Sequence, residues 1–117
     1  MVKRQKNILT VVMVFFIGIL LISDACFSLT IKDSMKFYDR GRREYKRGDY
    51  NDAIDYFKKA INECPESAMT EVSMYYLGKS YQMAGNTSMA VSTFNQLIEK
   101  YKSGKWVTWA KQEIKNK

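Results

Sequence analysis

Apolar residues along most of this chain recur at the spacing of an α-helix, and no stretch predicts a strand. Ala53 and Phe57, for example, lie four residues apart and therefore share one face of a helix. Glycine and proline interrupt the pattern and mark helix ends at Gly48, Pro65, Gly85 and Gly104. The pattern predicts five helices, over about residues 34–47, 50–64, 68–84, 87–102 and 104–116.

The chain repeats one arrangement of residues after an interval of 37 positions. The first copy reads GRREYKRGDYNDAIDYFKKAI, and the second reads GKSYQMAGNTSMAVSTFNQLI. The matched pairs are Gly41 with Gly78, Gly48 with Gly85, Ala53 with Ala90, Phe57 with Phe94, and Ile61 with Ile98. In each copy the first glycine fits a close approach of two helices, and the second fits a turn between them. The repeat therefore predicts two stacked helical hairpins.

The ends of the predicted helices carry further signals. Asp49 and Asn86 are suited to cap the second helix of each hairpin, because their side chains can accept hydrogen bonds from backbone amides of the first turn. The last segment, KWVTWAKQEIKNK, predicts a terminal capping helix with one face turned towards the second hairpin. The residues on that face are Trp106, Trp109, Ala110 and Ile114.

These features resemble the tetratricopeptide repeat family, whose hairpin has Leu-Gly and Tyr on its first helix, Gly-Asp-Tyr at its turn, and Ala and Phe on its second helix. The matching residues include Gly48, Asp49, Tyr50, Ala53, Phe57, Leu77, Gly78, Tyr81, Ala90 and Phe94. The resemblance implies an all-α solenoid over residues 34–117, with repeats at about 34–67 and 71–104 and a capping helix at about 104–116. The interval of 37 residues exceeds the family's usual length of about 34. In this respect the chain is similar to the repeats of bacterial outer-membrane assembly lipoproteins and Tol–Pal coordinators.

The N-terminal residues have the pattern of an export signal. Lysine and arginine precede an apolar run over residues 8–22, and small residues follow it at the place of a cleavage site. This predicts a signal peptide or membrane anchor over residues 1–25 and a linker over residues 26–33. Three fates stay open at the junction: cleavage after Ala25, retention as an anchor, or lipidation at Cys26. Each fate places the repeat domain outside the cytoplasm, in a periplasm or attached to a membrane.

Composition narrows the chemistry that this chain can perform. The sequence contains no histidine, which removes histidine-based nucleophiles, metal sites and proton transfer. Its two cysteines, Cys26 and Cys64, are too few for a zinc site, and we expect Cys64 to be a free thiol rather than a disulfide partner. We therefore expect no enzymatic activity, no catalytic residue, no metal and no cofactor. The formal charge of +7 favours acidic partners, and nucleic acid is not expected for an exported protein.

In tetratricopeptide families the first helices of the hairpins line a concave groove that binds partners. Carried onto this chain, the resemblance implies partner contacts at Tyr38, Arg42, Tyr45, Lys46, Tyr75, Lys79 and Gln82, with Met35, Val72 and Met83 beside them. Tyrosines beside cations suit an acidic or amphipathic segment of another protein. The alternative is that Tyr38 and Tyr75 only cover the seams between helices while the cations are solvated.

The favoured function is that of an exported protein–protein interaction adaptor in a bacterial cell envelope, with another envelope protein as its partner. Two alternatives stay open. One is a basic protein that binds a membrane surface or an anionic polymer, and the other is a structural lipoprotein. The sequence leaves the oligomeric state undefined.

Overall fold

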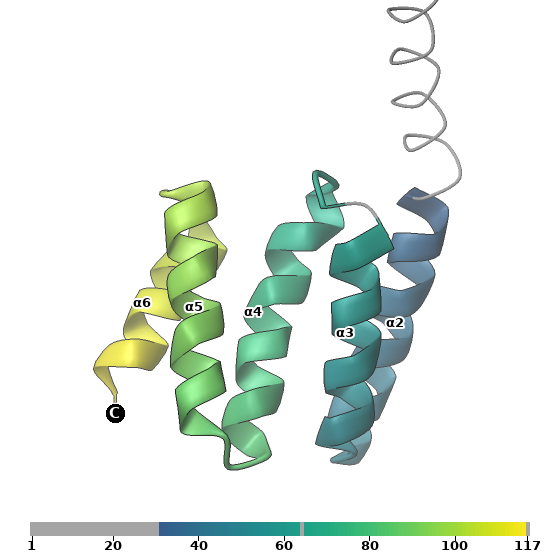
Figure 1. Ribbon diagram of the computed structural model, residues 1–117, viewed down its shortest axis with the longest axis horizontal. Coiled ribbons are helices and arrows are strands. Elements are labelled where there is room, and N and C mark those ends of the chain that lie inside the picture. The colour runs from purple at the N-terminus through teal and green to yellow at the C-terminus, as the bar shows by residue number, and fades with distance from the viewer. Residues whose placement is uncertain (1–30, 64, 117) are drawn as a thin grey trace, which may run out of the picture.

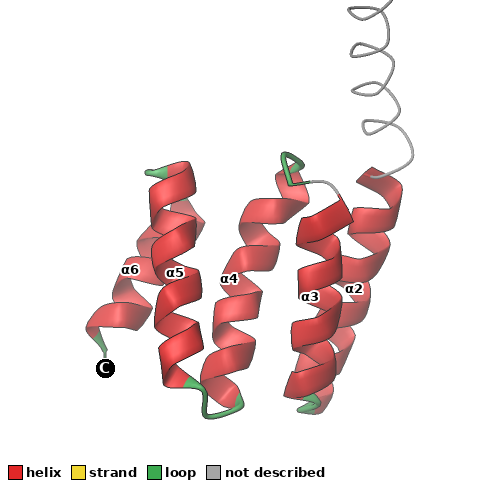
Figure 2. Ribbon diagram, in the orientation of Figure 1, coloured by secondary structure: helices red, strands yellow, loops and turns green. Residues whose placement is uncertain are grey.

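The computed structural model of the protein describes residues 31–63 and 65–116. Within these ranges every regular element is a helix, as Figure 2 shows. The helices are α2 (Ile31–Arg47), α3 (Tyr50–Glu63), α4 (Ala68–Met83), α5 (Thr87–Tyr101) and α6 (Lys105–Lys115). The predicted export segment over residues 1–25, Cys26 and Cys64 lie outside the described residues.

Helix α2 begins at Ile31, three residues before its predicted start, so residues 31–33 of the predicted linker are helical. Neither glycine nor proline interrupts this stretch, and Asp33 lies in the first turn, where a negative charge interacts favourably with the helix dipole. The other predicted helix ends agree with the structure to within one residue. None of the described helices is both long and apolar enough to span a membrane.

Within each hairpin, a glycine on the first helix faces a phenylalanine ring on the second. A Cβ atom placed on Gly41 would lie 2.7 Å from the Phe57 ring, and one on Gly78 would lie 2.5 Å from the Phe94 ring. Both rings are 0% exposed, so neither can move aside into solvent. The predicted close approach of the two helices at Gly41 and Gly78 is confirmed.

The turns inside the hairpins also agree with the prediction. Gly48 has φ +88° and Gly85 has φ +83°, a region in which residues with a Cβ are rarely found. The Asn86 side chain accepts a hydrogen bond from the Met89 amide at 3.2 Å, which confirms Asn86 as an N-cap. At the start of α3, the Asp49 backbone carbonyl accepts a hydrogen bond from the Ala53 amide at 3.0 Å, whereas a capping hydrogen bond to the Asp49 side chain stays a prediction.

The two hairpins stack through contacts between α3 and α4, and α6 packs against α5 and α4. Because α2 also contacts α4, the first helices of the hairpins and α6 form one row; in Figure 1, α3 and α5 lie in front of α2 and α6. On α6, Val107 and Ala110 are buried in the core, and Trp106 and Ile114 pack against it. Helix α6 therefore covers the second hairpin as predicted, although Val107, which was not predicted, is buried there and the predicted Trp109 stays exposed.

Candidate partner-binding surface

Tyr76 of α4 is the centre of the contact between α4 and the first hairpin. Its ring stacks on Phe57 with 5.9 Å between centroids, and it meets Tyr38 and Tyr45 edge-on at 6.3 Å and 5.8 Å. Each such aromatic pair contributes about 0.5–1.5 kcal/mol beyond its area burial. We refer to the contact formed by Tyr38, Arg42, Tyr45 and Tyr76 as the first seam.

Arg42 binds two tyrosines of the first seam. Its Nη1 donates a hydrogen bond to the Tyr38 hydroxyl at 2.8 Å, and its Cζ lies 4.5 Å from the centroid of the Tyr76 ring. A guanidinium over an aromatic face is held by the ring quadrupole. Partial burial disfavours the charged form, but the hydrogen bond to Tyr38 and the charge interactions with Tyr38 and Tyr76 outweigh it, so the pKa of Arg42 is raised. Arg42 therefore stays cationic at this seam.

Glu113 of α6 is the centre of the contact between α4 and α6. Lys79 Nζ donates to Glu113 Oε1 at 3.0 Å, the Tyr75 hydroxyl donates to the same oxygen at 3.3 Å, and Gln82 also hydrogen-bonds to this carboxylate. Partial burial opposes ionisation, but the hydrogen bond and charge of Lys79, with the bonds from Gln82 and Tyr75, hold the pKa of Glu113 below its ordinary value. We refer to the contact formed by Tyr75, Lys79, Gln82 and Glu113 as the second seam.

Two tryptophans of α6 enclose Tyr75 in the second seam. The Tyr75 ring lies 5.3 Å from Trp106 and 5.8 Å from Trp109, measured between centroids. Tyr75 is consequently only 9% exposed, whereas Trp109 stays 42% exposed. Burial, followed by the negative charge and hydrogen bonding of Glu113, raises the pKa of the Tyr75 hydroxyl. Tyr75 therefore remains a neutral hydrogen-bond donor to Glu113.

The structure divides the seven residues predicted to contact a partner. Tyr38, Arg42 and Tyr45 belong to the first seam, Tyr75, Lys79 and Gln82 belong to the second, and Lys46 lies exposed on α2. Beside them, Val72 is buried, whereas Met35 and Met83 are exposed. Contact with a partner stays a prediction for all seven, and α6 already covers the second group.

Four cations form a stripe along the exposed face of α2. Lys32, Lys36, Arg43 and Lys46 follow one another at spacings of four, seven and three residues, which places them on one face of the helix. All four are exposed, and none makes an ion pair or ring contact within the described residues. Shallow hollows lie beside Asp39 on this face. We refer to the four residues as the basic stripe.

The excess positive charge is concentrated in the row of helices that contains α2. Helix α2 carries seven Lys and Arg residues against three carboxylates. Helix α3, in the other row, carries two lysines against three carboxylates. The charge therefore forms a directional surface on α2, where an acidic partner would experience attraction.

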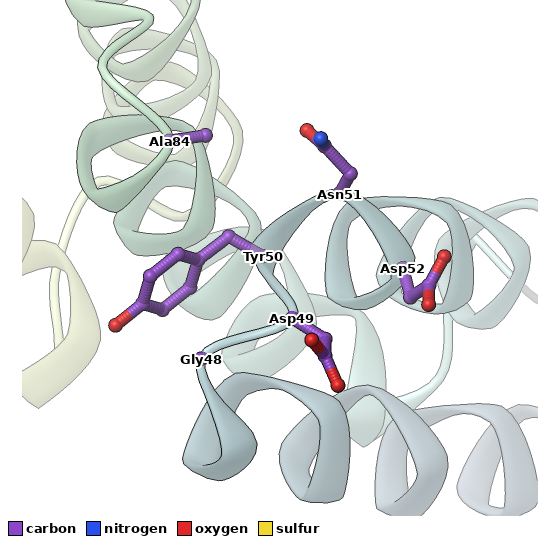
Figure 3. Close-up of a pocket in the computed structure, with 6 residues that line it drawn as sticks. All are labelled: Gly48, Asp49, Tyr50, Asn51, Asp52 and Ala84. Carbon is purple, nitrogen blue, oxygen red and sulfur yellow. The ribbon is translucent and has the colours of Figure 1, made fainter.

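A separate hollow lies at the turn of the first hairpin, and it is acidic rather than basic. It is lined by Gly48, Asp49, Tyr50, Asn51, Asp52 and Ala84, and Figure 3 shows the two aspartates on the first turn of α3 and in the turn before it. No group of three or more potential metal ligands occurs among the described residues. This hollow is distinct from both seams and from the basic stripe.

The stacked hairpins have a counterpart among known proteins. The family model described as Tetratricopeptide repeat matches residues 37–103. The chain belongs to the tetratricopeptide repeat family. Its tetratricopeptide domain is therefore a protein–protein interaction module, of a family that generally serves as a non-enzymatic scaffold. Comparison with curated proteins and with solved structures finds no match.

Two residues that organise the seams of the tetratricopeptide domain were missed by the sequence analysis. Tyr76 and Glu113 occupy corresponding places, because they too are separated by the interval of 37 residues. Extending the repeat by one more step, from the second hairpin into the capping helix, would have aligned Glu113 with Tyr76. That alignment relates the two positions, but it does not by itself assign either residue to a seam.

Proposed function

We propose that this protein is an exported adaptor of a bacterial cell envelope that binds an acidic segment of another envelope protein along α2. The observation that carries the proposal is the basic stripe, whose cations have no carboxylate partner among residues 31–63 and 65–116. The corresponding part of α4 is covered by α6. The tetratricopeptide fold supports the interaction function, and the predicted export segment over residues 1–25 supports a location outside the cytoplasm.

The surface beside the basic stripe suits a carboxylate-rich segment. Tyr38 and Arg42 restrict each other through their hydrogen bond, so binding a partner there would cost little additional side-chain conformational entropy. Met35, which is 47% exposed, offers an apolar contact next to the charges. An acidic segment with one apolar side chain would combine both contacts, and long-range attraction would speed its association.

Charge reversal tests this surface. We expect the double variant Arg43→Glu/Lys46→Glu to lower recovery of the partner in affinity purification by about tenfold or more, because attraction becomes repulsion at two positions. The matched control is Lys58→Glu/Lys59→Glu, which reverses two exposed charges on α3 in the other row. Far-UV circular dichroism checks that all variants keep their helices. Equal recovery with both double variants would contradict the proposed surface.

The export part of the proposal has its own test. We expect a C-terminal reporter that is active only outside the cytoplasm to be active on the full chain, and inactive when residues 1–25 are deleted. Metabolic labelling with a fatty acid, compared between the full chain and a Cys26→Ala variant, distinguishes lipidation from simple cleavage or anchoring. A reporter that remains inactive on the full chain would rule out export.

A second candidate function is binding to a membrane surface or an anionic polymer. The basic stripe favours it as well, since four cations on one helix face, without ion pairs in the part of the chain that the structure describes, also attract a surface of negative charges. In that case binding to anionic vesicles would fall steeply with added salt, because exposed charges are screened within about 8–10 Å at physiological ionic strength. Saturable binding to one protein at physiological salt would favour the adaptor instead.

A further inference from the structure

In the second seam, hydrogen-bond donors on α4 form a site for a carboxylate. The carboxylate that occupies this site is Glu113 of the same chain. Three donors on α4, from Tyr75, Lys79 and Gln82, converge on Glu113 of α6. The tryptophans of α6 flank Tyr75 at the same time. A short helix with two tryptophans and one carboxylate at these spacings is thus a ligand that fits this site.

The connection that delivers α6 to the site includes one residue, Lys102, in an unfavourable backbone conformation. Only residues 102–104 link α5 to α6. Lys102 has φ 59° and ψ −32°, and it is the one described residue other than glycine with positive φ. Gly104 has φ 117° and ψ 171°, which residues with a Cβ rarely adopt. Opening this hinge would release the strain at Lys102, whereas the closed form retains it.

We propose that α6 exchanges between two copies of this chain, so that the carboxylate site of one copy holds Glu113 of the other. A second copy supplies the one helix whose fit to this site the structure shows. All contacts of α6 are then kept, and only the hinge changes, which is the usual condition for a domain swap. An isolated helix of 11 residues is marginal in water, so a released α6 is stable only when docked on another copy.

Reversing the charges of the Lys79–Glu113 pair tests the exchange. Two full-length chains with different affinity tags are co-expressed and purified through both tags in sequence. Lys79→Glu and Glu113→Lys each place like charges in their own seam, whether α6 is closed or exchanged with an identical chain. When the two variants are mixed, exchange restores opposite charges in both seams. We expect the mixed pair to be recovered about tenfold more than either variant paired with itself, because two repulsive contacts become attractive.

A double variant provides the matched control. Lys79→Glu/Glu113→Lys restores an opposite-charge pair within one chain, so it should fold and pair with itself like the original chain. Exchange between this double variant and the original chain would place like charges in both seams, and we expect that combination to be recovered poorly. Association through any other surface, including residues 1–30, would be indifferent to these combinations.

Two results would overturn the proposal. One is equal recovery of all combinations, which would mean that the copies associate elsewhere. The other is a failure to recover any pair, including the original chain with itself, while circular dichroism shows folded helices. If the single variants do not accumulate, the original chain and the double variant still test the exchange. Exchange predicts that each of these two chains pairs with itself and that the two pair poorly with each other.

Discussion

The two seams use the same positions of the repeat but different chemistry. The corresponding residues on the first helices are Tyr38 and Tyr75, Arg42 and Lys79, and Tyr45 and Gln82, and the residues opposite them are Tyr76 and Glu113. In the first seam the cation lies 4.5 Å from the centroid of an aromatic ring. In the second seam the cation lies 3.0 Å from a carboxylate oxygen. One backbone arrangement therefore accepts either a cation–π contact or an ion pair.

This difference decides where positive charge remains available on the surface. Glu113 neutralises Lys79, so the second seam presents little net charge to a partner. The Tyr76 ring holds Arg42 without neutralising it, and the basic stripe on α2 lies beside it. A repeat can therefore keep a cation without a neutralising carboxylate in one unit and neutralise the corresponding cation in the next, without a change of fold.

The largest effect is expected where the two hairpins are most alike, at the buried phenylalanines. Phe57→Ala and Phe94→Ala should each lower the free energy of unfolding by about 3–5 kcal/mol, because each removes a fully buried ring and leaves a cavity. Urea unfolding followed by circular dichroism measures this. A loss well below 1 kcal/mol at either position would show that the corresponding hairpin does not pack around its ring.

The next effect concerns the glycines that face those rings. Gly78→Ala should lower the free energy of unfolding by about 1–3 kcal/mol, the range for overpacking a core, and Gly41→Ala by somewhat less. The order follows from the closest approach of the added Cβ to the ring, 2.5 Å at Gly78 and 2.7 Å at Gly41. Better helix propensity of alanine would raise stability by about 1 kcal/mol if the space were open, so stabilisation by either variant would contradict this packing.

The smallest effect separates the two seams by their response to pH. Because its folded pKa is lowered, Glu113 contributes stability above its ordinary pKa of 4.5, and that contribution is lost as the pH falls through the lower folded value. We expect a loss of up to about 1 kcal/mol on acidification, since the pair is partly exposed. The first seam has no such group, because Arg42 stays charged throughout this range.

Tryptophan fluorescence isolates the second seam, because both tryptophans lie on α6. Urea unfolding at pH 7 and at about pH 3.5 should show a smaller acid effect in Glu113→Gln than in the original chain. Glu63→Gln, which changes an exposed carboxylate on α3, serves as the control and should keep the original acid effect. An unchanged acid effect in Glu113→Gln would mean that the Lys79–Glu113 pair does not stabilise the fold.

Much of the fold could be predicted because the repeat fixes it locally. The glycine and phenylalanine pairs specify a close helix crossing, and the glycines with positive φ specify the turns, so element order and helix ends followed from the sequence. The start of α2 was placed three residues too late, because a helix without a breaker at its N-terminus gives no strong signal.

The site was predictable only in part, because the contacts of its residues depend on which residue of the neighbouring helix lies opposite them. The family resemblance placed Tyr75, Lys79 and Gln82 among the residues predicted to contact an acidic or amphipathic segment of a partner. It could not show that they contact an acidic residue of the same chain, Glu113, 34 positions after Lys79. Tyr76 was missed for the same reason, since its role in the first seam depends on rings from α2 and α3.

Photo-crosslinking in intact cells distinguishes α2 from the equivalent part of α4 as the surface proposed to bind a partner. Lys46 and Met83 are corresponding, exposed positions of the two hairpins, and Asp55 on α3 is an exposed control in the other row. A photoreactive residue at Lys46 should give one discrete adduct with a different protein, while probes at Met83 and Asp55 give none, apart from adducts with a second copy of this chain. An adduct with a different protein from Met83 without one from Lys46 would show that the partner binds at α4 and not at α2.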